Sequence, residues 1–243
     1  AKRDQFAAEL EQLAGNEENM NKLAKEIEKK EKIVAKLAIE LADMREIGAK
    51  ALKQGVEKEL KELHMNGVRF GVDFNYPPDP QGFVQYHKEK LKPTSIGLGT
   101  LEFLFSPNPG EELRPLAKIA SGGELSRIML ALKSILNKQD TIPVMIFDEV
   151  DTGIGGRIAE KVGAKLKKVA ETKQVFCITH LPQIAGMAST HYRVEKKVQG
   201  KRTRAGIRQL EFAERVEELA RMSSGEKITE ASLQHARELI SDH

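Results

Sequence analysis

The stretch VMIFDEVDTGIGGRIAEKVGAKLKKVAETKQVFCITH, residues 144–180, decides the fold class of this chain. Val144–Phe147 and Val175–Thr179 are short apolar runs of the kind that form buried strands, and Ile158–Val169 between them has the periodicity of an amphipathic helix. Strands of this kind that alternate with helices are typical of a parallel sheet covered by helices. The sequence therefore predicts an α/β fold with a parallel sheet layer and flanking helices.

Two carboxylates follow the first of these strands, because VMIFDE ends in Asp148 and Glu149. Ligands in α/β proteins bind at the carboxyl ends of parallel strands. There, one carboxylate can hold Mg²⁺ and the next can activate a water molecule. The alternative is a pair of solvated acids or a helix cap, but the Gly-rich turn that follows at Val150–Gly156 favours a ligand site.

A turn suited to an anion lies at Ala120–Arg127, ASGGELSR, just ahead of an apolar helix. Ser121, Gly122 and Gly123 would present backbone N–H groups at the positive end of that helix, which suits a phosphate. The same turn also fits an ordinary helix start, since Ser121 and Glu124 have the spacing of a capping box. The motif alone leaves both interpretations open.

His180 follows the second buried strand, in the stretch VFCITHLP. From that place an imidazole could donate a hydrogen bond to a phosphate oxygen, although a lone histidine after a strand is more often structural. The three stretches stand in the order SGG, DE, His within 60 residues, from Ser121 to His180. This joint order favours a nucleotide-binding function over three unrelated structural features.

Residues 1–66 differ in composition from the rest of the chain, with 13 Lys or Arg, 14 Asp or Glu, no proline and a single aromatic residue. Seven apolar residues are spaced by three and four, with Lys30 in the one remaining position: Met20, Leu23, Ile27, Val34, Leu37, Leu41 and Met44. This heptad pattern predicts a coiled-coil arm over residues 1–66, with a break near residues 15–16 where the phase changes. A long surface helix packed on its own domain is the alternative.

Residues 67–243 read as a separate domain, in which several further elements are expected. These are strands at Val68–Phe74 and Thr100–Phe105, helices at Ile128–Leu136 and Pro182–Ala188, a hairpin of Tyr192–Val198 with Arg204–Leu210, and helices at Glu211–Met222 and Thr229–Ile240.

The predicted hairpin is strongly basic, because Arg193–Arg208 holds seven Lys or Arg against the single acid Glu195. Phosphate groups of DNA attract such a surface. The candidate DNA contacts are Lys196, Lys197, Lys201, Arg202 and Arg204. The alternative is a solvated hairpin whose lysines keep its edges from pairing.

Composition excludes several classes of protein. A hydrophobic fraction of 40% excludes wholesale disorder, and no apolar run is long enough to span a membrane. We expect no secretion signal, no zinc site and, with Cys177 as the only cysteine, no internal disulfide, which fits a reducing cytoplasm. The net charge of +3 is by itself too small to indicate nucleic-acid binding.

Together these motifs resemble the second half of an ATP-binding-cassette ATPase head, in which a signature loop is followed by a Walker B strand, a D-loop and a switch histidine. The sequence G-x-x-x-x-G-K-[ST] of a Walker A loop does not occur in the chain. An arm that leads directly into a signature half resembles proteins of the structural-maintenance-of-chromosomes (SMC) type. Within that group, three stretches of the chain resemble the RecN family of bacterial DNA-repair proteins. They are IASGGELSRIMLALK, IFDEVDTGIGGRIA and ITHLPQIAGMA.

The resemblance implies the C-terminal lobe of an SMC-type ATPase head, a P-loop-NTPase-like fold preceded by the end of a returning coiled-coil arm. It implies that Ser121, Gly122 and Gly123 contact the γ-phosphate of ATP bound on an opposing head. Asp148 would help to hold Mg²⁺, directly or through water, and Glu149 would be the general base.

By the same resemblance, Asp151 belongs to the D-loop that crosses the head interface, and His180 to the switch that senses the γ-phosphate. The expected cofactors are ATP and Mg²⁺, and the expected partners are the N-terminal head lobe, a second copy through the heads, and DNA, with no membrane. The expected place is the cytoplasm, at the nucleoid, in recombinational repair of double-strand breaks. The fragment alone is expected to be inactive; the rival hypotheses are a transporter ATPase subunit and a non-catalytic coiled-coil scaffold.

Overall fold

The computed structural model describes residues 2–118, 121–137, 139–199, 202–225 and 227–241. The chain folds as two compact units, one of Ala1–Leu52 with Gly71–Phe103 and the other of Lys53–Phe70 with Leu104–His243. This division differs from the predicted boundary at residue 66. The last turns of the predicted arm belong to the second unit, and a segment of the predicted head domain belongs to the first.

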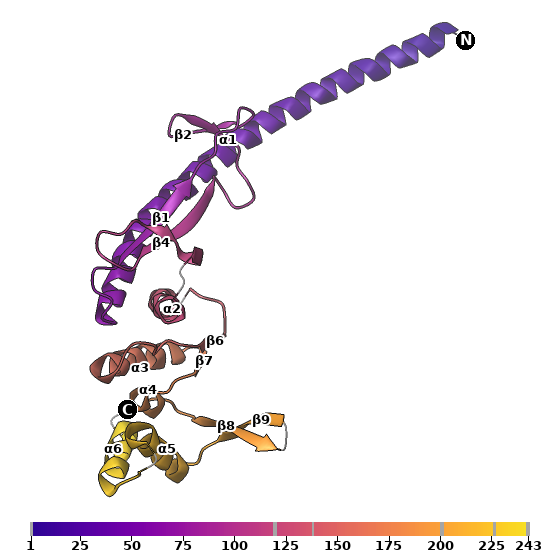
Figure 1. Cartoon of the computed structure of the whole chain (residues 1–243). Coiled ribbons are helices and arrows are strands. Elements are labelled where there is room, and N and C mark those ends of the chain that lie inside the picture. Colours follow the sequence, from indigo (N-terminus) through magenta and orange to yellow (C-terminus); the bar gives the residue numbers. More distant parts are fainter. Residues whose placement is uncertain (1, 119–120, 138, 200–201, 226, 242–243) are drawn as a thin grey trace. The chain divides into compact units, whose positions relative to one another are not determined.

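The first helix, α1 (Lys2–Glu62), is a single uninterrupted helix (Figure 1). It runs through Gly15 and Asn16, so the break predicted there is not observed. One glycine costs a helix only about 1 kcal/mol relative to alanine, too little to end a helix with good helix formers on both sides. The seven heptad residues of α1 are all exposed, from 38% for Leu41 to 70% for Met20.

A small hairpin that the sequence did not predict packs on α1 within the first unit. Strands β2 (Val84–Tyr86) and β3 (Glu89–Leu91) pair antiparallel through a tight turn, and their buried residues contact Ala38 and Ala42 of α1. The Tyr86 hydroxyl donates a hydrogen bond of 3.0 Å to the Asp43 carboxylate of the same helix. Strands of three residues are too short to show an alternating pattern, so no hairpin could be predicted here from the sequence.

The two long strands predicted early in the chain are confirmed as β1 (Arg69–Asn75) and β4 (Thr100–Ser106). They belong to a three-stranded sheet of order β1-β4-β5, in which the short strand β5 (Arg114–Pro115) runs antiparallel to β4. A 3₁₀ turn follows at Leu116–Lys118.

The second unit contains the remaining elements, in which helices and strands alternate from α2 to α4 and are followed by a hairpin and two helices (Figure 1). They are α2 (Gly122–Leu136), β6 (Val144–Phe147), α3 (Gly156–Ala170), β7 (Gln174–Cys177), α4 (Pro182–Gly186), β8 (Tyr192–Gln199), β9 (Arg202–Gln209), α5 (Phe212–Ser224) and α6 (Glu230–Ser241). β6 and β7 pair in parallel, with register from Val144↔Gln174 to Phe147↔Cys177. The predicted strands, their connecting helix and the parallel pairing are therefore confirmed, but the predicted burial of the strands is not. Met145 and Phe147 of β6 are buried, whereas Val144, Ile146 and, in β7, Phe176 are exposed, so one face of this two-stranded sheet is uncovered in the chain.

The core of this unit joins α2, β6, α3 and α4 through buried apolar side chains, among them Leu130, Phe147, Val162 and Ile184. Each buried side chain of this size removes enough apolar surface from water to stabilise the fold by about 1.5–3 kcal/mol. These contacts fix the start of α2 and the carboxyl ends of β6 and β7, where the candidate site lies. Among the residues that the structure describes, no helix is both long and apolar enough to cross a membrane.

Candidate functional site

The parallel pair β6 and β7 ends in register, which brings the turns that follow them to one edge of the sheet. Phe147 is paired with Cys177, and the amide of Ile178 donates to the Phe147 carbonyl at 2.9 Å. Asp148 and Glu149 follow directly, and both side chains are exposed. We call residues Asp148–Thr152 the acid turn.

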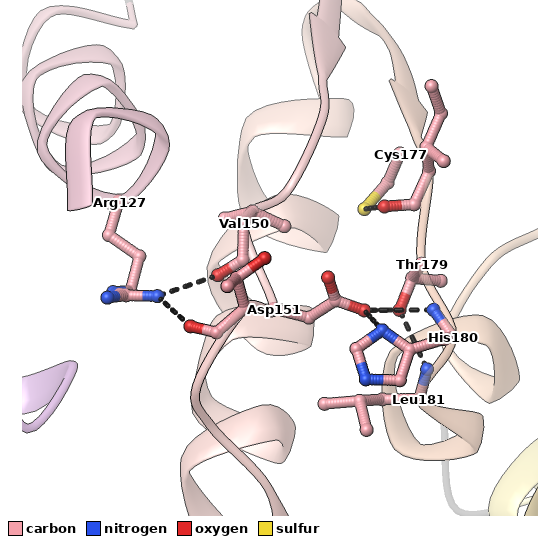
Figure 2. A network of polar contacts seen from close by, with 9 residues as sticks. Arg127, Val150, Asp151, Cys177, Thr179, His180 and Leu181 are labelled. Atoms are coloured by element: carbon pink, nitrogen blue, oxygen red, sulfur yellow. Dashed lines mark hydrogen bonds and ion pairs between the residues drawn. The ribbon is translucent and has the colours of Figure 1, made fainter. Parts of the chain in front are cut away.

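Asp151 is the buried member of the acid turn, with only 3% of its surface exposed. Its Oδ2 atom accepts hydrogen bonds from the Thr179 hydroxyl at 2.5 Å and from the His180 amide at 2.9 Å, and lies 3.0 Å from His180 Nδ1 (Figure 2). The Thr179 hydroxyl in turn accepts from the Leu181 amide at 3.0 Å. The carboxylate of Asp151 therefore holds residues 179 and 180 of the same unit through its Oδ2 atom.

The side chain of His180 remains 71% exposed although one of its ring nitrogens is held by Asp151. A carboxylate acceptor at Nδ1 favours the tautomer that carries hydrogen on that atom. The ring is thereby oriented, and Nε2 is left for a second partner. The structure thus brings together two residues that the sequence separates by 29 positions, Asp151 and His180.

The signature turn, which we define as Ser121–Gly123, starts α2 in the way that the simpler interpretation predicts. Ser121 is the N-cap, and its hydroxyl accepts from the Glu124 amide at 3.4 Å. A side chain at Gly122 would meet the Glu149 carboxylate, and one at Gly123 would lie 2.9 Å from the Thr152 side chain. The signature turn and the acid turn are therefore in close contact. The approach requires glycine at residue 123, where a side chain would also lie 3.1 Å from the Glu149 carbonyl oxygen, whereas at Gly122 only the mobile end of the Glu149 side chain would have to shift.

Three residues of this site carried no prediction from the sequence. Ser126 Oγ donates to the Asp148 carbonyl at 2.6 Å, Arg127 Nη1 donates to the Thr152 carbonyl at 2.8 Å, and Thr179 holds Asp151. The sequence feature that could have indicated this network is Arg127, an arginine near the start of an otherwise apolar helix. A cation buried there needs hydrogen-bond acceptors.

Cys177 lies behind the acid turn with its side chain half-buried. Burial, together with the negative charges of Asp151 and Asp148, raises the pKa of the Cys177 thiol to about 12. A thiol reacts through its thiolate. We therefore expect iodoacetamide at pH 8 to alkylate native Cys177 more slowly than a free cysteine by a factor on the order of a thousand.

The matched control for Cys177 is the same protein in urea, where the thiol should recover the reactivity of a free cysteine. The rate in the native protein should keep rising with pH well above pH 9. Rapid native alkylation at pH 8 would contradict the assignment of a protonated, inert thiol.

Few side chains of the candidate site could bind a metal ion. Within the described parts of the chain, no group of three or more His, Cys, Asp or Glu side chains is placed to hold an ion. Asp148 offers one exposed carboxylate. It fits Mg²⁺ as a single ligand, in the manner of sites where waters and substrate phosphates complete the shell.

The predicted hairpin is confirmed as the antiparallel pair β8 and β9, in which Lys197 is paired with Arg204. Arg193 forms ion pairs with Glu218 at 3.1 Å and with Glu195 at 3.3 Å, so acids offset part of the positive charge near the hairpin base. Of the candidate DNA contacts, Lys196 and Arg204 have exposed side chains. Lys201 and the side chains of Lys197 and Arg202 lie outside the described residues.

Comparison with known proteins gives relatives over nearly the whole chain. It is 38% identical over 234 residues to the DNA repair protein RecN of Bacillus subtilis (strain 168), covering 96% of this chain and 41% of that protein. It is 41% identical over 237 residues to the DNA repair protein RecN of Rickettsia conorii (strain Malish 7), covering 98% of this chain and 41% of that protein.

Among solved structures, an SMC head domain with coiled coil and joint from Pyrococcus yayanosii is similar at a TM-score of 0.47, with 18% identity over 74% of this chain and 30% of that one. No family model matches the chain. The chain spans about two fifths of the length of the RecN proteins named above. Over the part of those proteins that it spans, this chain is a homologue of the bacterial DNA repair protein RecN.

Proposed function

We propose that this chain is the C-terminal half of the ATPase head of a RecN-type, SMC-like DNA-repair protein, together with the end of its coiled-coil arm. The observation that carries the proposal is the assembly of the signature turn, the acid turn and His180 into one contiguous site. The assembly matters because each motif alone also fits a structural role. Here the acid turn contacts the signature turn on one side and His180 on the other, so all three lie together at the end of the parallel strands, where α/β proteins bind ligands.

In this proposal Glu149 accepts the proton of the attacking water, because its carboxylate is exposed beside the signature turn. Asp148 supplies one ligand to Mg²⁺, which when bound with ATP would neutralise phosphate charge. Asp151 orients His180 through Nδ1 and leaves Nε2 available to a phosphate oxygen of a bound nucleotide. Ser121 and the glycines present backbone N–H groups to a phosphate.

Because this chain contains no Walker A sequence, we propose that the ATPase site is formed by two polypeptide segments, this chain and an N-terminal lobe. Asp148 and Glu149 can act only on a nucleotide held by a separate N-terminal lobe. The signature turn acts on a second nucleotide, across an interface between two heads. The proposed partners are therefore the N-terminal lobe of the complete protein and a second copy of the head.

The exposed apolar stripe on α1 supports the coiled-coil part of the proposal. Met20, Leu23 and Ile27 are each more than half exposed in this chain alone, and a second helix would cover them in a two-stranded coil. DNA binding, including by the hairpin β8–β9, action in recombination, and a place at the nucleoid in the cytoplasm belong to the same proposal. They follow from the likeness to RecN proteins.

The test of the proposal is ATP hydrolysis by this chain mixed with a separately produced N-terminal lobe, with and without DNA. We expect no turnover by either piece alone and magnesium-dependent turnover by the mixture. Turnover by the pure chain would contradict the split site. An inactive mixture of two folded and associated pieces would favour a non-catalytic scaffold.

A further inference from the structure

Arg127 is a buried cation to which the proposed chemistry gives no task. It lies on the second turn of α2, it is 8% exposed, and its Nε atom has no partner among the described residues. Burial lowers the pKa of its guanidinium, against a smaller opposing effect of Glu124. A charged group in such a place needs well-placed acceptors to remain stable.

The acceptors of Arg127 are two backbone carbonyls of the acid turn. Its Nη1 atom donates to the Thr152 carbonyl at 2.8 Å and to the Val150 carbonyl at 3.3 Å (Figure 2). The neighbouring Ser126 hydroxyl donates to the Asp148 carbonyl at 2.6 Å. Two consecutive residues of α2 therefore hold three alternate carbonyls of the turn, on both sides of Glu149.

The acid turn has a backbone conformation that needs such support. Glu149 has a φ angle of 58°, in the left-handed region that non-glycine residues rarely adopt. Within the turn itself, the Thr152 amide donates to the Glu149 carbonyl at 3.0 Å. That single bond closes the turn but leaves its outward carbonyls to be satisfied from elsewhere, and α2 satisfies them.

We infer that Arg127 is a positioning residue, which holds the acid turn in its left-handed conformation and so aims the Glu149 carboxylate. It acts through backbone atoms and touches no substrate. The hold on the turn stands on the contacts above, whereas its consequence for catalysis rests on the proposed function. Arginine suits the task because its planar fork fixes the direction of its donors, while a lysine ammonium at the same site is a flexible point charge.

The first test measures amide hydrogen exchange in this chain without nucleotide. Arg127→Met should speed exchange of the Thr152 and Ile154 amides about tenfold, since a hydrogen bond to a charged group is lost. Arg127→Lys should restore part of the protection. The matched control is Arg215→Met, because Arg215 also donates to backbone carbonyls, those of Ala185, Gly186 and Ala188, but has no bond to the acid turn.

The inference that Arg127 stabilises the acid turn is wrong if Arg127→Met leaves exchange of the Thr152 and Ile154 amides unchanged. It is also wrong if Arg215→Met speeds that exchange equally. A global loss of structure is separated from the local effect by the amides of α5, which should exchange at wild-type rates in Arg127→Met as well as in Arg127→Lys.

The second test measures ATP hydrolysis by the complete protein. Arg127→Met should lower kcat about tenfold with KM for ATP unchanged, and Arg127→Lys should recover part of kcat. A normal kcat alongside accelerated exchange would overturn the aiming of Glu149. If the wild-type protein has no ATPase activity, both the proposed function and the positioning of Glu149 for catalysis are wrong. The exchange experiment alone decides whether Arg127 stabilises the acid turn.

Discussion

Glu149→Gln in the complete protein is expected to lower ATP turnover at least about a hundredfold while ATP binding persists. The amide keeps the size of the side chain but cannot accept the proton of the attacking water. The contacts that place residue 149 are made by backbone atoms, since Ser126 and Arg127 hold carbonyls on either side of it. The substitution should therefore change the chemistry and leave the turn intact.

Because hydrolysis would be blocked after ATP is bound, Glu149→Gln should accumulate ATP-bound head dimers, which size-exclusion chromatography with ATP and Mg²⁺ would detect. The matched control is Glu160→Gln on α3, an equal change at an exposed position of the same unit. Glu160→Gln should hydrolyse ATP at the wild-type rate. Normal hydrolysis by Glu149→Gln would remove this residue as the base.

The α/β part of the structure could be predicted from the sequence because its signals are local. The four residues of β6 are uninterrupted apolar side chains, and α3 has a regular apolar face, so the order strand, helix, strand was visible in residues 144–180. The parallel pairing of β6 with β7 followed from the helix between them, because a crossover with a helix joins parallel strands.

The side-chain network of the site could not be predicted, because it depends on which atoms meet after folding. The spacing of Asp151 and His180 along the chain carries no information about their contact, which follows from the shared register of β6 and β7. Likewise the three carbonyls held by Ser126 and Arg127 belong to backbone groups that any sequence has. The types of the residues indicated the chemistry of the site, whereas their hydrogen-bond partners depended on the topology of the fold.

Two other differences arise from weak local signals. The change of heptad phase at Gly15 predicted a break, yet helix propensity on both sides outweighs one glycine. The boundary predicted at residue 66 followed composition, whereas the compact units follow contacts, and the hairpin β2–β3 joins the first unit by packing on α1. The composition of a segment indicates how exposed it is to solvent, but not which other element it packs against.

Asp151→Ala is expected to lower the free energy of unfolding of this chain by about 2–4 kcal/mol, measured by urea denaturation at neutral pH. The alanine would leave the Thr179 hydroxyl and the His180 amide without their acceptor in a turn that is closed to water at residue 151. The contact with the His180 ring adds little to this figure, because that side chain is largely exposed. Most of the loss therefore comes from two hydrogen bonds to a buried carboxylate.

The matched control is Asp148→Ala, three residues earlier in the same turn, where the side chain is exposed. Its effect should stay within about 0.5 kcal/mol, as for most surface substitutions. Asp151→Asn should lie between the two, because an amide oxygen can still accept from Thr179 and the His180 amide but without the charge. Equal stability of Asp151→Ala and Asp148→Ala would mean that the buried carboxylate does not stabilise residues 179 and 180. The graded order instead would assign Asp151 the structural task of placing His180, whatever nucleotide the complete protein turns over.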